Sequence, residues 1–542
     1  MGKKVIGIDY GSDSARAVLV DVENGNIIST VAAVYPRWSE GRYCDAAASS
    51  FRQHPLDYTE VLRKVLKGVL EGCDCKEDIV GIGVDTTAST PALTDAEGTP
   101  LALKEKFADN PDAMFVLWKD HTGTSEAEEI VKVWGGGAVN YCETCGGDYS
   151  AENIWSKVLH IIKTNPEVAA EAHSVIELCD YIPSVLIGKR CRNAYSTIAY
   201  KALWAKKWGG LPAEELYAEL GGDKFVEIRN SLTSEPCFGT EPVGTLCKEW
   251  ADELGLSQDV VVCAGVIDSL AGAVGAGCSP GKMALNMGTS ACLIAVDPDF
   301  KDGMMIKGVF GQFPDGVVPG MMCFEMGLSS FGDNFAWLKR FLAGTMKSLL
   351  AGKVSDEVIA EAEDKILPSL AEAASALPFR EDAPFASDWF NGRRSPEPNP
   401  SLRATVSGLG LATDAAEVYY AIVEATALAM KTIVDHLAER GIVFDAFIGV
   451  GGIAQKAPFV MQMLADAIGK DIRVSQTKQS CALGSAICAS VVAGIYPTIE
   501  AAQAALCQPI IRTYTPNAER RALLQKRHEL YRAAGKFTES LL

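Results

Sequence analysis

Residues 7–21 read GIDYGSDSARAVLVD, an apolar strand, a polar turn and a second apolar strand in immediate succession. A tight hairpin needs only a glycine at its tip. This turn also carries Asp9, the hydroxyls of Ser12 and Ser14, and Arg16. Glycine leaves main-chain N–H groups unobstructed and hydroxyls add short donors, so a turn of this composition suits a phosphate group.

A second copy of this unit occurs in the other half of the chain. Residues 283–296 read MALNMGTSACLIAV, again a strand, a glycine–hydroxyl turn (Gly288, Thr289 and Ser290) and a strand. The repetition indicates an α/β fold duplicated over residues 1–279 and 280–542, with a cleft between the halves. Two unrelated hairpins are the alternative. A third glycine cluster at 449–452 adds to the case for a nucleotide held between domains.

The spacing of apolar residues predicts the remaining elements. In the first half it predicts strands at 5–9, 16–22, 27–31, 79–85 and 260–268, a helix near 56–71 and a helix-rich stretch at 124–220. In the second half it predicts helices at 414–440, from 455, from 481 and at 516–538, strands at 445–449 and 471–475, and a loop over 380–400. Arg393 and Arg394 on that loop face a ligand or a carboxylate of the other domain, or are simply solvated.

Composition sets the broad class. The chain has 542 residues, 48% of them hydrophobic, which is more than one core usually organises. Its formal net charge of −19 argues against nucleic acid as a partner. Because the overall field repels anions, a phosphorylated ligand needs local amides, a few basic side chains or a metal ion.

Two features bear on the compartment. The N-terminus runs directly into a strand pattern with no signal or transit peptide, and the most apolar stretch, Val260–Cys278, contains Asp268, which argues against a membrane span. We therefore expect a cytoplasmic protein. Sixteen cysteines fit that compartment, and those in apolar runs, Cys481 among them, are expected to be small core residues.

Zinc binding is not predicted. The pairs Cys73/Cys75 and Cys142/Cys145 lack the second CxxC or the H-x3-5-H that would complete a site.

The sequence leaves the oligomeric state open, a homodimer included.

Buried acids are the next signal. Asp268 interrupts the most apolar run, where a carboxylate must be paired, metal-bound or functional. There it can accept a proton from an alcohol that attacks a phosphoryl group, or cap the helix that follows. Asp9, at a strand end beside the first turn, suits Mg²⁺. Glu325 and Lys201 lie among apolar and aromatic residues and suit sugar hydroxyls. Asp85 ends another strand, and the sequence favours a ligand contact and a role in forming the turn equally for this residue.

These patterns together resemble the FGGY family of carbohydrate kinases. The resemblance rests on the paired turns, GVDTTAST, GVIDSLAGAVGAG, MGTS and GVGGIAQKAPFVMQMLAD, and it runs from about residue 4 to 500. It implies two ribonuclease-H-like domains of the actin/hexokinase type. Further segments, including FRQHPLDY, NPDAMFVLWKDHT, YKALW and DWFNGRRSP, are similar to the branch that phosphorylates L-ribulose at O5 with ATP and Mg²⁺.

The resemblance also assigns roles to individual residues. It implies that Asp268 is the catalytic base, Asp9 the metal ligand, and Ala88, Lys201, Glu325 and Asp268 the ketopentose contacts. It places the ATP phosphates and the adenosine on the following residues: Gly11, Ser12, Ser14, Arg16, Gly288, Thr289, Ser290, Gly451, Gly452 and Gln455.

Two positions depart from the family pattern. Ser12 replaces a common threonine, and the nucleotide loop reads Gly-Gly-Ile-Ala instead of Gly-Gly-Gly-Ala, so the adenine contacts are less defined than the phosphate contacts. Three alternatives stay open at this stage: a kinase for D-ribulose, ribitol or xylulose, an actin-like ATPase switch, and a non-catalytic sugar sensor.

Overall fold

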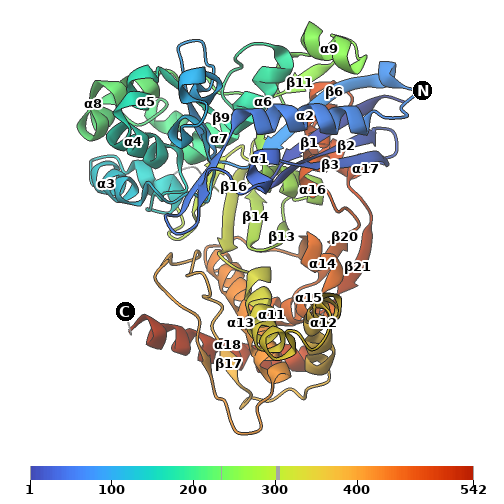
Figure 1. Ribbon diagram of the computed structural model, residues 1–542. Helices are drawn as coiled ribbons and strands as arrows, with labels where there is room; N and C mark the ends of the chain where they lie inside the picture. The colour runs from blue at the N-terminus through green and yellow to red at the C-terminus, as the bar shows by residue number, and fades with distance from the viewer. Residues whose placement is uncertain (1, 234, 301–304, 541–542) are drawn as a thin grey trace. The chain divides into compact units, whose positions relative to one another are not determined.

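A computed structural model describes residues 2–233, 235–300 and 305–540 (Figure 1). Its internal contacts divide the chain into two compact units. The first comprises Met1–Ser279, Val296–Phe324 and Gln479–Gln508, and the second comprises Pro280–Ala295, Glu325–Lys478 and Pro509–Leu542. The longest segment of the first unit ends at Ser279. Two later segments belong to the first unit, so neither unit is continuous in sequence.

The first unit is built on a mixed sheet in the order β10-β11-β6-β1-β2-β3, with β12 also paired to β6. Strands β1, β2 and β3 form an antiparallel meander, whereas β1, β11 and β12 run parallel to β6. The strand bounds are Lys4–Tyr10 (β1), Ser14–Asp21 (β2), Ile27–Val34 (β3), Ile79–Thr86 (β6), Pro242–Thr245 (β10), Val261–Cys263 (β11) and Val266–Ile267 (β12). The predicted strands at 5–9, 16–22, 27–31 and 79–85 are confirmed.

Smaller strands and a set of helices complete this unit. The strands are Cys44–Asp45 (β4), Ser50–Gln53 (β5), Pro91–Thr94 (β7), Phe115–Val116 (β8), Ser174–Glu177 (β9) and Gly311–Pro314 (β15). The helices are Pro36–Ser39 (α1), Pro55–Val69 (α2), Thr124–Trp134 (α3), Ile154–Thr164 (α4), Pro166–Glu171 (α5), Leu178–Ile187 (α6), Tyr195–Lys201 (α7), Glu214–Asn230 (α8), Lys248–Leu254 (α9), Asp268–Ala276 (α10), Ser480–Val492 (α16) and Ile499–Leu506 (α17). The predicted helix near 56–71 and the helix-rich stretch are confirmed.

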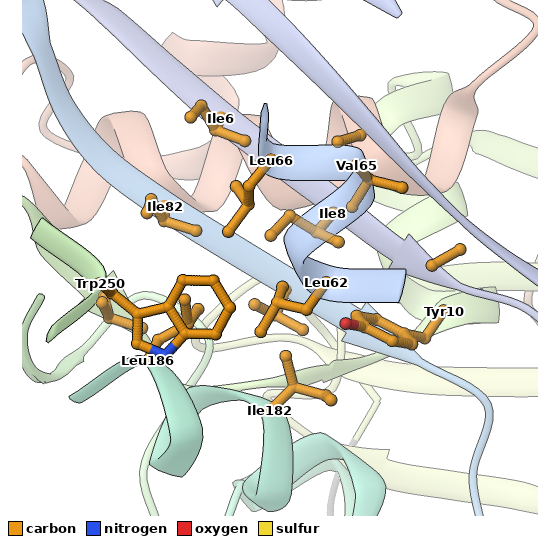
Figure 2. Close-up of a cluster of buried hydrophobic side chains, with 14 of the residues drawn as sticks. Ile6, Ile8, Tyr10, Leu62, Val65, Leu66, Ile82, Ile182, Leu186 and Trp250 are labelled. Atoms are coloured by element: carbon orange, nitrogen blue, oxygen red, sulfur yellow. The ribbon is translucent and has the colours of Figure 1, made fainter. Parts of the chain in front are cut away.

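One face of the sheet is covered by α2. Pro55 occupies its first turn and the side chain of His54 accepts a hydrogen bond from the N–H of Leu56, which fixes where the helix begins. Figure 2 shows its buried side chains against those of β1 and β6, with residues of α6 and α9 below. This apolar layer makes the sheet a rigid platform for side chains at its edge.

The other face is covered by α16, which approaches the sheet unusually closely. A Cβ atom at Gly7 would lie 1.8 Å from the carbonyl oxygen of Ala482, and one at Gly83 would lie 2.0 Å from that of Ser485. Only glycine fits at these points of β1 and β6. The two glycines therefore bring the start of α16 to the carboxyl ends of both strands.

The predicted single strand at 260–268 is wrong, because the chain breaks into β11 and β12. The interruption lies at Ala264 and Gly265. A Cβ at Gly265 would meet the carbonyl oxygen of Cys179 at 2.0 Å, so the main chain bends where it passes α6. The bend places β12, and Asp268 directly after it, beside the end of β6.

The second unit contains a sheet in the order β16-β14-β13-β19-β20-β21. The strands are Lys282–Met287 (β13), Ala291–Asp297 (β14), Met322–Leu328 (β16), Ala446–Val450 (β19), Ile472–Ser475 (β20) and Ile510–Tyr514 (β21), with the pair Phe385–Ala386 (β17) and Val406–Ser407 (β18) apart from it. The helices are Gly332–Leu350 (α11), Asp356–Ser375 (α12), Ala415–Ala438 (α13), Gly452–Lys456 (α14), Pro458–Ile468 (α15) and Ala518–Glu539 (α18). The strand–turn–strand at 283–296 and the helices near 414–440 and 516–538 are confirmed.

The helix predicted from about residue 455 is divided in two. It begins at Gly452 as α14 and restarts as α15 at Pro458, because proline fits the first turn of a helix but not its interior. Within the described ranges, no helix is both long and apolar enough to span a membrane.

Candidate functional site

Three carboxylates meet at the carboxyl edge of the first sheet. In the parallel register Asp9 of β1 lies opposite Asp85 of β6, and Val266 of β12 also pairs with Asp85. Asp268, the first residue of α10, follows β12 directly. Because carboxyl ends of parallel strands share one edge, Asp9, Asp85 and Asp268 gather there, as the strand-end positions of these acids require.

Asp9 and Asp85 are both buried, 5% and 0% exposed. The Arg16 guanidinium lies 3.2 Å from Oδ2 of Asp9, and Ser485 donates to Oδ2 of Asp85 at 2.6 Å. Burial raises the pKa of Asp9, and Arg16 opposes that rise. Burial, the charge of Asp9 and the charge of Asp268 raise the pKa of Asp85 well above its usual range. Oδ1 of Asp85 is buried and accepts no hydrogen bond from a described donor, and the Asp85 carboxyl, when it holds a proton, shares a hydrogen bond with Asp9.

Asp268 differs from these two acids because it is partly exposed. The N–H of Ser269 donates to its Oδ1 at 2.7 Å, and its place in the first turn of α10 favours a negative charge. An accessible carboxylate at a helix N-terminus can accept a proton from a bound hydroxyl. The alternative prediction, that Asp268 caps the following helix, is wrong, because Ile267 is the N-cap and Asp268 is already the first residue of α10.

The Asp9–Asp85 pair can hold a divalent cation. Their carboxylate oxygens and the Sγ of Cys481 all lie within 4.8 Å of one another. Mg²⁺ takes oxygen ligands, so the two carboxylates, with the unpartnered Oδ1 of Asp85, fit Mg²⁺ while the thiol does not. Cys481, expected from its apolar run to be a core residue, is partly exposed and lies beside these acids.

The first predicted phosphate turn is a rigid hairpin tip. Gly11 N–H donates to Ser14 O at 3.0 Å and closes the turn. Gln53 donates to the carbonyl of Ser12 at 2.7 Å, and the indole N–H of Trp118 donates to the Ser12 hydroxyl at 2.9 Å. These contacts fix the turn while its outer surface stays accessible.

That outer surface carries open donors. Among the described residues, the N–H groups of Ser12 and Asp13 have no acceptor. Gly11 has no left-handed φ, and a Cβ there would meet only Ser14 O at 3.5 Å and Arg16 Nη1 at 3.8 Å, which is ordinary contact. The fold therefore does not require a glycine at this position. A group that approaches the main chain from outside does explain it.

The turn in the second unit repeats this geometry. Gly288 N–H donates to Ser290 O at 3.0 Å, and the N–H groups of Thr289 and Ser290 find no acceptor in the described ranges. A Cβ at Gly288 would meet only Ser290 O, at 4.0 Å. The start of α11 braces the turn, since Phe331 N–H donates to Thr289 O at 2.7 Å. Both predicted phosphate turns thus have N–H groups without an acceptor among the described residues. Each also has a glycine at a position where the fold leaves room for a side chain.

The predicted adenosine residues also lie in the second unit, at the end of β19. Gly451 adopts φ +96° and crosses close to Met287 O, whereas Gly452 is exposed, and a Cβ added there would have nothing within 4 Å. Nε2 of Gln455 lies within hydrogen-bond distance of the carbonyls of Ser475, the last residue of β20, and of Gln476 and Thr477 after it, at 2.9 Å for Thr477. Gln455 therefore ties α14 to the end of β20, and its contact with a base stays a prediction.

Two of the predicted sugar residues of the first unit lie near a buried lysine, Lys157, which bonds to the residue after Ala88 and interacts with the charge of Lys201. Ala88 is partly exposed and Lys201 is 7% exposed, with its ammonium 3.9 Å from the centre of the Tyr200 ring. Lys157 of α4, 1% exposed, donates to the carbonyls of Ser89 at 2.6 Å and Leu117 at 2.9 Å.

Lys157 thereby joins the segment that carries Ala88 to the segment that carries Trp118. Burial lowers the pKa of Lys157 to about 7, and burial raises that of its neighbour Glu177 to about 7. Lys157 is not among the residues predicted from the sequence, although a lysine on the apolar face of a helix (IWSKVLHII) is a visible signal.

Glu325 lies on β16, whose seven residues are all buried, and its Oε2 has no hydrogen-bond partner within the described residues. A buried carboxylate oxygen of this kind favours a ligand hydroxyl. Arg393 pairs with Glu539 and Glu397 and stacks on Trp389, all in its own unit. These contacts give Arg393 a structural role.

Comparison with known families gives two matches that together span most of the chain. Residues 4–275 match the N-terminal domain of the FGGY family of carbohydrate kinases, and residues 283–493 match its C-terminal domain. Among curated proteins, the chain is similar to ribulokinase of Vibrio parahaemolyticus, with 38% identity over 99% of this chain and 96% of that protein. It is also similar to ribulokinase of Shouchella clausii, with 34% identity over 98% and 94%.

Solved structures share the fold at lower identity. A xylulose kinase from Brucella ovis aligns with a TM-score of 0.81 and 18% identity, over 99% of this chain and 100% of that one. Plasmodium falciparum glycerol kinase with ADP aligns with a TM-score of 0.76 and 16% identity, over 99% and 98%. The two-domain α/β fold expected from the sequence is confirmed.

Proposed function

The chain belongs to the FGGY family of carbohydrate kinases, and on that premise we propose that it transfers the terminal phosphoryl group of ATP to the 5-hydroxyl of L-ribulose. Kinases of this family use ATP, so the chain is an ATP-dependent sugar phosphotransferase and neither a bare ATPase switch nor a passive sensor. The choice of L-ribulose is supported by relatives named ribulokinase at 38% and 34% identity.

The observation that carries the proposal is the group of acids beside an open hairpin tip. Asp268, accessible and held at the start of α10, accepts the proton of the attacking hydroxyl. The sugar oxygen then forms a bond to the terminal phosphorus, the bond from that phosphorus to the bridging oxygen breaks, and ADP leaves. The proton on Asp268 passes to solvent before the next turnover.

The phosphates are proposed to bind where donors are free. The N–H groups of Ser12 and Asp13 in one turn, and of Thr289 and Ser290 in the other, have the spacing of two adjacent amides that suits phosphate oxygens. Arg16 adds a positive charge beside the first turn. Since phosphates and carboxylates repel each other, a cation is needed beside Asp9 and Asp85.

Mg²⁺ fits that need, with Asp9 and Asp85 as the residues that would hold it. When bound, it neutralises part of the charge on the phosphates. For the sugar we propose contacts from Lys201 and the main chain at Ala88, and from the unpartnered Oε2 of Glu325. A cytoplasmic location is part of the proposal, since the described residues form no disulfide. A homodimer stays a prediction.

The test is a panel of acceptor sugars in an assay of ADP release with Mg²⁺ and ATP. The proposal expects the highest kcat/KM with L-ribulose, ahead of D-ribulose, D-xylulose and ribitol, and little ADP without sugar. A higher kcat/KM with another acceptor overturns the substrate assignment. Release of ADP at the same rate with no acceptor overturns the sugar kinase itself.

A further inference from the structure

Cys481 lies beside the two acids that we propose as Mg²⁺ ligands, although Mg²⁺ does not bind thiols. It is the second residue of α16 and partly exposed, and its Sγ lies within 4.8 Å of carboxylate oxygens of both Asp9 and Asp85. Oδ1 of Asp85, a residue 0% exposed, receives no hydrogen bond from any donor in the described part of the chain. The close approach of α16 at Gly7 and Gly83 holds the three side chains together.

This donor set suits a particular class of metal ion. Mg²⁺ and Ca²⁺ prefer oxygen alone, whereas thiolate ligands select softer ions such as Zn²⁺ and Cd²⁺. Zinc commonly takes three protein ligands and leaves a fourth position open to water or another ligand. The negative charge of Asp9, Asp85 and Asp268 attracts a cation to this place, and the ion pair printed for Arg16 is with Asp9. The same charges, with burial, disfavour the thiolate of Cys481 in the metal-free chain, so the thiol gives up its proton only when a metal ion takes its place.

We propose that Asp9, Asp85 and Cys481 form a binding site for a thiophilic divalent cation, with Zn²⁺ as the biological member of that class. On binding, the Cys481 thiol and any protonated carboxyl of the pair lose their protons to solvent, and Sγ and one oxygen of each carboxylate form bonds to the metal. Nothing is oxidised or reduced. A bound Zn²⁺ occupies both carboxylates, so Mg²⁺ cannot bind them and phosphoryl transfer is inhibited. This inhibition rests on the proposed function, whereas the binding of Zn²⁺ does not.

The binding test uses Cd²⁺, because a cadmium–thiolate bond gives an ultraviolet charge-transfer band. The thiols of Cys73 and Cys75 lie 3.3 Å apart and are a competing dithiol, so the full-length chain is first prepared as Cys73→Ser/Cys75→Ser. In this background, stripped of metal with a chelator, we expect one tightly bound Cd²⁺ per chain and a thiolate band.

Three substitutions in that background decide the assignment. Cys481→Ser is expected to abolish the band, and Asp85→Asn to weaken Cd²⁺ binding at least about 10-fold, since even indirect partners of metal ligands contribute that much. Cys44→Ser, at a partly exposed thiol in the same unit, is the matched control and is expected to keep the band. A band that survives Cys481→Ser, or an affinity unchanged in Asp85→Asn, overturns the site.

Two further measurements keep the test independent of variant folding and of the sugar. In the unsubstituted chain, Zn²⁺ is expected to slow alkylation of Cys481 by N-ethylmaleimide, read by peptide mass spectrometry, and equal alkylation with and without Zn²⁺ contradicts the proposal. In the kinase assay, inhibition by Zn²⁺ is expected to be relieved by excess Mg²⁺. A chain that binds Cd²⁺ through Cys481 but shows no kinase activity keeps the metal site and refutes the proposed function.

Discussion

Replacing Gly11 by alanine separates the effect on folding from the effect on phosphate binding. Gly11 has no left-handed φ, and the added Cβ would meet its nearest atoms, Ser14 O and Arg16 Nη1, at 3.5 and 3.8 Å. The folded chain therefore accepts the methyl group. Because alanine also restricts the unfolded chain, the free energy of unfolding is expected to rise by about 0.4–1 kcal/mol.

The same methyl group projects from the surface that we assign to the phosphates. If it displaces a phosphate from the N–H groups of Ser12 and Asp13, two charge-assisted hydrogen bonds of about 1.5 kcal/mol or more each are lost. Since 1.4 kcal/mol corresponds to a factor of ten, ATP affinity should fall about 100-fold.

Isothermal titration with ATP measures that affinity, and urea unfolding measures stability. Gly344→Ala is the matched control. That glycine lies in α11 with nothing within 4 Å of its added Cβ, so the substitution should stabilise the chain and leave ATP affinity unchanged. ATP affinity of Gly11→Ala within twofold of wild type refutes the phosphate assignment of the turn.

Lys157→Met removes the ammonium that holds the carbonyls of Ser89 and Leu117, and should raise KM for the sugar about tenfold with a stability loss of about 3 kcal/mol. Arg527→Met is the control, because it removes a similar buried cation from main-chain carbonyls in the second unit. This variant should lose stability but keep the wild-type KM for the sugar. Equal KM values in the Lys157 and Arg527 variants contradict the role of Lys157. Burial raises the pKa of Asp180 to about 6 from 3.8, so its folded form retains the proton more tightly, and the free energy of unfolding should fall by about 3 kcal/mol as pH rises from about 4 to about 6. Other buried acids such as Asp388 contribute a fall of the same sign in both proteins, so urea unfolding at several pH values should show a fall about 3 kcal/mol smaller in Asp180→Asn than in wild type. Parallel pH curves argue against this role of Asp180. Glu325→Gln removes an acceptor without breaking any bond to its Oε2, so KM for the sugar should rise about tenfold with unchanged stability, and an unchanged KM excludes Glu325 from the sugar site.

The sequence predicts well those features that are local in the chain. Each strand–turn–strand unit is contained within about fifteen residues, and the alternation of apolar runs with glycine and hydroxyls defines it without knowledge of the rest. Asp9 and Asp268 are recognisable for the same reason, because each interrupts or ends a buried run. Their convergence follows from parallel pairing at one sheet edge.

Features that depend on distant contacts were not predictable. Cys481 is indistinguishable from other cysteines in apolar runs until α16 packs on Gly7 and Gly83 and brings it to Asp9 and Asp85. The break at Gly265 depends on how closely the chain passes the carbonyl of Cys179. Neither the approach of α16 to Gly7 and Gly83 nor that of Gly265 to Cys179 changes the periodicity of apolar residues in the sequence.

The central claim is that Asp268 accepts the proton of the sugar hydroxyl, and Asp268→Asn tests it most directly. Asparagine keeps the size of the side chain but cannot act as a base, and general-base catalysis contributes about 10²–10⁴ to the rate. We expect sugar-dependent ADP release to fall by at least about 100-fold, while titration with ATP gives an affinity close to that of wild type. Sugar phosphorylation at the wild-type rate in this variant contradicts the account.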